Sequence, residues 1–409
     1  DLSRAPEELQ FTVDWQTILR LALCGMCGLF GLIYLPRTVH RFQVFPSFCL
    51  LPFVAWACVS TVFGIAPSYS AASVVALVCM IVFAPAILEV LGKRGTTLTI
   101  ICALLGYILI SWFLFWAFPS LGRSPFEMPD NRIIYRVGGD AQQLGFQAAW
   151  VGGFLLLLGL DGSARWSRLI VPLALAYATI PFTQSRTAAL ASVAVAGVVF
   201  LPRARWTTLS LGACAGVAAI TLAVLLSEMG WLGDAEMAAR KVSRSGEAEE
   251  IYNLTGRTAV WEHALLKISM RPLLGWGYGA SRQAIGAYPQ ADFGDFEPLH
   301  AHNQVINTAL CVGIVGAGLL AAMFLGLLVT CLRRPDPVVG MALAFVFVAG
   351  ITEPVLFGPM PRSHTVIWLL AMFWPQYQPT TCLSFAQSAD LQARVGEDSP
   401  NYGGPAELT

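Results

Sequence analysis

The stretch LHAHNQVINTALCVGIVGAGLLAAMFLGLLVTCL, residues 299–332, decides the fold class. It opens with polar residues that include two histidines, and from Gln304 to Leu332 it contains no charged side chain. Because about 20 consecutive apolar residues are enough for a helix to cross a bilayer, this stretch predicts a transmembrane helix with polar groups at its start.

Similar apolar runs recur along the chain. Of all 409 residues, 56% are hydrophobic and 12% are charged, whereas a soluble domain has about 25% charged residues. Runs of this length favour helices over barrel strands, so we expect an all-α polytopic membrane protein with about 11–12 transmembrane helices and one long periplasmic helical loop. Spans are predicted at Ile18–Leu35, Val44–Phe63, Ala71–Leu91, Leu98–Phe118, Ala141–Leu160, Leu169–Thr183, Thr187–Leu201, Thr207–Leu226, Gln304–Leu332, Val338–Phe357 and His364–Phe373.

Basic residues fall in every other short connection between these spans. The positive-inside rule therefore predicts one consistent orientation, in which the loops 119–140, 228–303 and 358–363 lie outside. In a bacterial inner membrane, outside is the periplasm. The basic residues are Arg37, His40 and Arg41, then Lys93 and Arg94, then Arg165 and Arg168, then Arg203 and Arg205, and finally Arg333 and Arg334.

This orientation predicts how the chain is divided. Residues 1–228 form the first eight transmembrane helices with short loops, and residues 229–303 form the long periplasmic loop with the candidate catalytic motifs. Residues 304–378 form the C-terminal transmembrane helices, and the polar residues 379–409 are expected to be a disordered cytoplasmic tail.

The cysteines give no sign of a disulfide-braced module, since none lies in the long polar loop. Cys24 and Cys27 form a CxxC pair, but inside a predicted span. We interpret them as small apolar packing residues rather than as redox or metal groups.

Arg186 lies at the tip between two predicted spans of about 15 residues each. At about 1.5 Å per residue such helices reach about 22 Å, less than the about 30 Å of hydrocarbon. The tip is therefore expected below the outer membrane surface unless the bilayer thins there. A recessed arginine is costly, so Arg186 is a candidate functional residue, and a snorkelling anchor is the alternative.

Arg257 is expected in the first turn of a helix over Arg257–Met270, which Thr255 can cap. The helix macrodipole favours anions and disfavours cations at that end. An arginine there is explained if it and the free backbone N–H groups face a bound anion such as a phosphate. The alternative is an exposed arginine that bends away into water.

Aromatic residues lie in and after this helix. Trp261, Leu265 and Ile268 are expected on one apolar face. Trp276 and Tyr278 stand among glycines in the turn sequence GWGYG. Such aromatics suit the membrane interface or stacking on a sugar face.

His300 and His302 form an HxH pair directly before the span at Gln304. A metal site would need further ligands, such as Asp292, Asp295 or Glu297, whose spacing is weak, so we predict no metal and no cofactor. Histidine titrates near neutral pH and could act instead as a general base for a hydroxyl nucleophile. A polar helix start at the membrane interface is the remaining alternative.

Other polar residues gather at the predicted periplasmic rim. Arg136 and Asp140 precede one span, Glu353 lies near the outer end of another, and Arg362 follows it. Each alone is typical of a membrane interface. A proton-coupled transporter more often places its carboxylates near the membrane midplane, so the pattern favours chemistry at the rim.

Several of these segments together resemble the signature region of the O-antigen ligase and polysaccharide polymerase superfamily. They are LTGRTAVW (254–261), RPLLGWGYG (271–279) and HAHNQ (300–304), followed by VGIVGAG. TQSRTAAL (183–190) resembles its short arginine motif and YRVGGDAQQLG (135–145) an earlier arginine segment. Such proteins often have one span more than predicted here, with both ends inside, so a span missing before Asp1 would reconcile the two.

The resemblance implies an inverting, metal-independent glycosyltransferase on the periplasmic face of the bacterial inner membrane. Its donor would be a glycan on undecaprenyl diphosphate. In a ligase of lipopolysaccharide biosynthesis the acceptor would be a sugar hydroxyl of lipid A–core, and in a polymerase a second lipid-linked glycan. An O-antigen ligase is the leading interpretation; the alternatives are an O-antigen or exopolysaccharide polymerase of the same superfamily and, more distantly, a transporter of lipid-linked glycans.

The resemblance also implies roles for residues of the matching motifs. His302 would be the general base, and Arg186 and Arg257 would act in catalysis by binding the diphosphate. Guanidinium groups can stabilise the charge that grows on a diphosphate leaving group. Further candidates for binding the diphosphate or the glycan are Arg136, His300, Trp276 and Tyr278.

Overall fold

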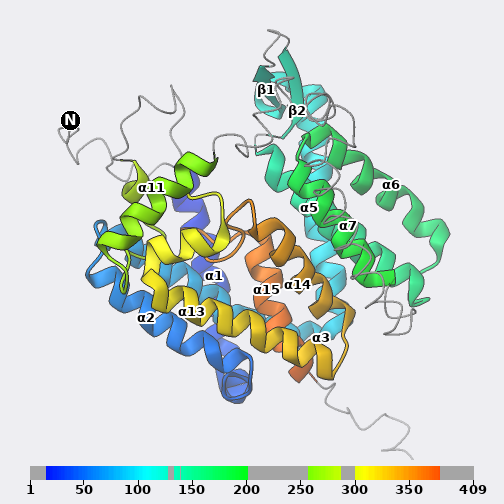
Figure 1. Ribbon diagram of the computed structural model, residues 1–409. Coiled ribbons are helices and arrows are strands. Elements are labelled where there is room, and N and C mark those ends of the chain that lie inside the picture. Colours follow the sequence, from blue (N-terminus) through cyan, green and yellow to red (C-terminus); the bar gives the residue numbers. More distant parts are fainter. Residues whose placement is uncertain (1–14, 128–132, 139, 201–256, 287–299, 378–409) are drawn as a thin grey trace, which may run out of the picture. The chain divides into compact units, whose positions relative to one another are not determined.

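The computed structural model describes residues 15–127, 133–138, 140–200, 257–286 and 300–377. This part of the chain is helical apart from one hairpin, which confirms the predicted all-α polytopic class (Figure 1). The helices are α1 (Trp15–Thr38), α2 (Leu50–Val62), α3 (Pro67–Ala117), α4 (Pro119–Gly122), α5 (Ala141–Leu160), α6 (Trp166–Thr183), α7 (Arg186–Phe200), α11 (Arg257–Met270), α12 (Ser281–Ile285), α13 (Gln304–Arg333), α14 (Pro337–Gly350) and α15 (Ser363–Phe373), with short 3-10 helices η2 (Val39–Gln43), η3 (Ser47–Cys49) and η7 (Trp374–Gln376).

Each predicted span falls on a helix, except the one at Thr207–Leu226, which lies outside the described residues, as do the predicted tail 379–409 and much of the long loop. The division of the chain into these parts stays a prediction. Among the described helices, four are long and apolar enough to cross a membrane, and shorter apolar helices accompany them. The four are Ile18–Gln43, Pro67–Ala117, Ala141–Leu160 and Gln304–Arg333; the shorter ones are Ser47–Val62, Arg186–Phe200 and Pro337–Gly350.

Helix α3 contains two of the predicted spans. It runs for 51 residues, but Gly92 interrupts it with φ 65°, a conformation outside the helical region. Two helices therefore meet at a sharp bend at Gly92. The bend lies directly before Lys93 and Arg94, the basic connection that the sequence predicts between these two spans. The Lys93 ammonium lies 3.5 Å from Asp336, directly before α14, so two connections predicted on the inner side do lie together.

A second break lies inside α13. Val312 and Gly313 leave helical geometry, and Gly313 has φ 72°. The segment after α11 fills this gap, because Trp276 N–H donates to Leu310 C=O at 2.9 Å and Ile314 N–H donates to Pro272 C=O at 2.8 Å. Irregular backbone within a membrane segment is tolerated where protein groups take up its polar atoms, and here they do.

Helix α11 has the predicted bounds but a different buried face. Val260 and Ala264 are buried in a cluster against α12 and the start of α13, and Ile268 packs on it. Leu265, expected on that face, is 54% exposed. The predicted face was therefore wrong by about one position, because the helix packs through its own small residues Val260 and Ala264 rather than through Leu265.

Two further elements differ from the prediction. Helix α14 ends at Gly350 rather than at Phe357, since Glu353 precedes a proline and the residue before proline is pushed out of the helical region. The loop after α4 contains a hairpin of β1 (Arg123–Glu127) and β2 (Ile133–Val137), which pair antiparallel with Ser124 opposite Arg136. The earlier end of α14 places Glu353 in the segment that follows the helix.

Candidate active site

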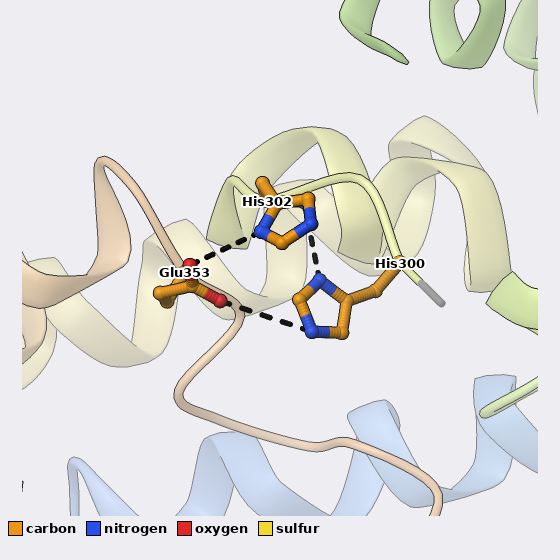
Figure 2. A group of neighbouring side chains, drawn as sticks. All are labelled: His300, His302 and Glu353. Carbon is orange, nitrogen blue, oxygen red and sulfur yellow. Dashed lines mark hydrogen bonds and ion pairs between the residues drawn. The ribbon is translucent and has the colours of Figure 1, made fainter. Parts of the chain in front are cut away.

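The site is organised around the carboxylate of Glu353, whose side chain is only 6% exposed. Its Oε1 accepts a hydrogen bond from Arg257 Nη2 at 2.9 Å and lies 3.1 Å from His302 Nδ1. Its Oε2 lies 3.8 Å from His300 Nε2. Figure 2 shows both imidazoles beside this carboxylate. Two residues predicted for catalysis, Arg257 and His302, therefore share one oxygen atom.

The HAHNQ motif holds the segment that carries Glu353. Asn303 caps α13 by accepting from the N–H groups of Val305 and Ile306, and its Nδ2 donates to Ile351 C=O at 3.0 Å. Gln304 Oε1 accepts from Leu356 N–H at 2.6 Å, while its Nε2 donates to the same residue's C=O. The backbone on both sides of Glu353 is thus fixed to the start of α13.

His302 is held in an uncommon conformation, with φ 46°. A non-glycine residue in the left-handed region costs free energy and persists only where neighbouring contacts impose it. Here the imposing contacts are the Asn303 cap and the Glu353 hydrogen bond. This conformation aims the imidazole at the carboxylate.

The helix start that carries Arg186 is linked to the segment that carries Glu353. It begins α7, directly after Gln184 ends α6 in a left-handed conformation with φ 51°. Its neighbour Thr187 shares a hydrogen bond of 2.8 Å with Thr352, the residue before Glu353. The start of α7, where the side chain of Arg186 is exposed, is therefore tied to the segment that carries the carboxylate.

Burial and neighbouring charged groups shift the pKa values of His300 and Glu353. Burial and the adjacent His302 lower the pKa of His300 to about 4, against a smaller opposing effect of Glu353. Burial alone would raise the pKa of Glu353, but His302, His300 and Arg257 together hold it below its ordinary value. At neutral pH the carboxylate is therefore charged and the His300 imidazole is neutral.

The contact between His302 and Glu353 sets the roles of the two ring nitrogens. A carboxylate can only accept a hydrogen bond, so the proton lies on Nδ1 and the basic lone pair on Nε2. A carboxylate in this position orients an imidazole and stabilises its protonated form. Such a pair could act as a general base with its orienting partner.

The same atoms could also hold a metal. One ligand atom each from His300, His302 and Glu353 lie within 4.8 Å of one another. The further ligands considered from the sequence, at 292–297, lie outside the described residues. The Arg257 guanidinium already occupies one carboxylate oxygen and would repel a cation there. The absence of a metal from the reaction thus stays a prediction.

The remaining candidate residues have structural partners. Trp276 donates from Nε1 to Lys267 C=O at 2.9 Å, and the Arg271 guanidinium lies 4.5 Å from its ring. Tyr278 is only 2% exposed, which leaves its ring no surface for a sugar, so in this structure it is a packing residue. Arg136 lies on β2 and donates to Ser124 Oγ at 3.4 Å.

Glu353 is the functional candidate whose role the sequence did not reveal. It appeared there only as one of several rim residues. Its partners Arg257 and His302 lie 96 and 51 positions away along the chain. The one available signal was a carboxylate near the outer end of a predicted span, where an unpaired charge would be costly.

The fold and the cluster define a multi-spanning membrane protein with acid–base side chains gathered between the starts of α11 and α13 and the segment after α14. Residues 170–321 match the family model described as O-antigen ligase. This match supports the O-antigen ligase superfamily that the motifs resemble. It covers Arg186, Arg257 and both histidines and ends before Glu353. No curated protein matches the chain.

Proposed function

We propose that the protein is a metal-independent, inverting glycosyltransferase that works on the periplasmic face of a bacterial inner membrane. It moves a glycan from undecaprenyl diphosphate to a sugar hydroxyl of lipid A–core, as an O-antigen ligase. The observation that carries the proposal is the single Glu353 oxygen that contacts both His302 and Arg257. This oxygen links His302, the base for the acceptor hydroxyl, to Arg257, the cation for the leaving group.

The reaction follows from these positions. The acceptor hydroxyl attacks the anomeric carbon while His302 Nε2 takes its proton, and Glu353 stabilises the imidazolium that forms. The bond between the anomeric carbon and the diphosphate oxygen breaks on the opposite face, so the configuration inverts. The electron pair of that bond stays on the diphosphate, whose growing charge needs cations.

Arg257 can serve Glu353 and the diphosphate together. The guanidinium has five N–H donors in a planar fork, and the contact with Glu353 uses Nη2. Its side chain is 22% exposed, so part of it faces outward from the carboxylate. Arg186, at the start of α7, supplies a second guanidinium, and its neighbour Thr187 is hydrogen-bonded to Thr352, the residue before Glu353.

The acceptor decides between ligase and polymerase. Purified protein is given lipid-linked glycan with either lipid A–core or additional donor. Product on lipid A–core is expected. A lengthened donor without that product would make the protein a polymerase of the same superfamily. Movement of the lipid-linked glycan across liposomes without either product would make it a transporter and overturn the proposal.

A further inference from the structure

One pair of hydroxyl groups connects two parts of the candidate site that come from distant segments. Thr187 Oγ1 and Thr352 Oγ1 share a hydrogen bond of 2.8 Å, although they lie 165 positions apart in the chain. Thr187 directly follows Arg186, and Thr352 directly precedes Glu353, the partner of His302. The contact therefore joins the helix start that carries a candidate diphosphate ligand to the segment that orients the candidate base.

Thr187 differs from most threonines of the described helices. A threonine inside a helix can bond the carbonyl group of the preceding turn, and seven of those described do so with the residue four positions earlier. They are Thr38, Thr61, Thr97, Thr99, Thr179, Thr308 and Thr330. For Thr187 that residue is Thr183, which lies before the left-handed turn at Gln184 that separates α6 from α7. Its hydroxyl bonds Thr352 instead.

The start of α7 is also held by contacts of its own. Ser185 Oγ caps the helix by accepting from Ala188 N–H at 3.2 Å. A Cβ on Gly145 of α5 would lie 2.7 Å from Ala188 Cβ, so α5 and α7 pack closely there. Closely packed helices do not adjust freely. The contact with Thr352 thus relates a fixed helix start to the segment after α14.

That segment is fixed to α13 as well. Asn303 and Gln304 hold the backbone on both sides of Glu353. These contacts place the carboxylate relative to the histidine motif. The Thr352 hydroxyl adds a contact from α7, and with it a defined spacing between the backbone of Glu353 and that of Arg186.

We infer that Thr187 and Thr352 are positioning residues for glycan transfer, which keep the helix start of Arg186 at a fixed spacing from the Glu353–His302 pair. The inference rests on the proposed function, because it requires both ends of the site to act on one glycosidic bond. The base meets the acceptor hydroxyl while a guanidinium meets the departing diphosphate, so both must be placed at the same moment. A misplacement of about 1 Å can lower a rate about 100-fold.

Valine variants test the inference, because valine keeps the branched shape and removes the hydroxyl. Thr187→Val and Thr352→Val should each lower kcat about tenfold or more with a smaller change in KM, since misplacement weakens the transition state most. The double variant should be little slower than either single one, because both substitutions remove the same contact. Thr187→Ser and Thr352→Ser keep the hydroxyl and should keep most of the rate.

Thr330→Val is the matched control. Thr330 is half-buried like the pair, but its hydroxyl bonds only the Gly326 carbonyl group within α13, so kcat should stay at the wild-type value. Wild-type kcat in both valine variants of the pair would overturn the inference. Fully additive losses in the double variant would also overturn it, because they would show that the two hydroxyls act separately.

A cysteine pair gives a second test within one folded protein. Because the two oxygens are 2.8 Å apart, Thr187→Cys with Thr352→Cys brings two sulfur atoms near the bonding distance of about 2.05 Å. The oxidised double variant should transfer glycan at about the wild-type rate, and reduction of the same sample should lower the rate about tenfold. Wild-type protein treated with the same oxidant and reductant is the control. Equal rates in both states, a faster reduced form, or failure of the bond to form would contradict the inference.

The wild-type rate separates this inference from the proposed function. If the wild type transfers glycan to neither lipid A–core nor additional donor, the proposed function fails, and the positioning role fails with it. If the wild type transfers glycan and the valine and cysteine variants all match it, the proposed function stands and only the positioning role fails.

Discussion

Glu353 sets the state of its three neighbours: it orients His302, neutralises Arg257 and stands beside His300. The sequence identified each of these neighbours, because a histidine pair before a span and an arginine at a helix start are unusual by themselves. It did not show that one carboxylate joins them, since that depends on packing between segments far apart in the chain.

Replacing Glu353 by Gln keeps the size of the side chain but removes the charge that stabilises the protonated His302. We expect kcat to fall about 10²–10⁴-fold with a smaller change in KM, because the charge matters most when the imidazolium forms. Glu262→Gln on the exposed face of α11 is the matched control. A Glu353→Gln variant with wild-type kcat and pH profile would remove Glu353 from the mechanism.

Acid should destabilise the protein through His300. Its folded-state pKa of about 4 lies below the ordinary 6.5, so the unfolded chain takes up the proton first, and stability is lost as pH falls from about 6.5 towards 4. The shift corresponds to roughly 3 kcal/mol over that window. Thermal unfolding at several pH values should show a smaller fall in Tm for His300→Asn than for the wild type. Parallel curves would show that His300 does not couple to folding.

At the scale of elements, the break in α13 and the segment after α11 form one structure. The sequence predicted the start of α13 and the turn in GWGYG, because apolar length and glycines mark them. The break at Gly313 escaped prediction, since a glycine in an apolar helix resembles an ordinary packing position. Backbone contacts from Pro272 and Leu273 decide its conformation.

Gly313→Ala should therefore disrupt the fold around the site. A Cβ at Gly313 would overlap the Leu273 carbonyl group, and the residue has φ 72°. We expect a loss of at least about 2 kcal/mol, because overpacking and the unfavourable backbone conformation add up. Gly318→Ala in the same helix has nothing within 4 Å and should keep the wild-type Tm. Equal Tm values for the two variants would refute the close backbone approach.

At the scale of the whole molecule, membrane physics made the fold predictable. Apolar runs of bilayer length can only be helices or barrel strands, so hydropathy alone located the helices. The orientation that the basic connections indicate stays a prediction. The hairpin β1–β2 and the end of α14 could not, since short polar segments carry weak signals. The site was predicted as a set of separate residues, and packing alone brought Arg257, His302 and Glu353 together.

Transfer should be independent of divalent metal. Arg257 at 2.9 Å from Glu353 supplies the positive charge that a metal would otherwise bring to this carboxylate. Activity after treatment with a chelator should match that of untreated protein. Strong inhibition that Zn²⁺ or Mg²⁺ reverses would instead assign His300, His302 and Glu353 as metal ligands.

The most direct test of the central claim compares the wild type with His302→Asn in transfer of glycan from undecaprenyl diphosphate to lipid A–core. Asparagine tolerates the left-handed conformation at φ 46°, so the variant should fold with a Tm close to that of the wild type. Loss of the general base predicts a rate at least about 100-fold lower. A folded His302→Asn protein that transfers glycan at the wild-type rate would contradict the account.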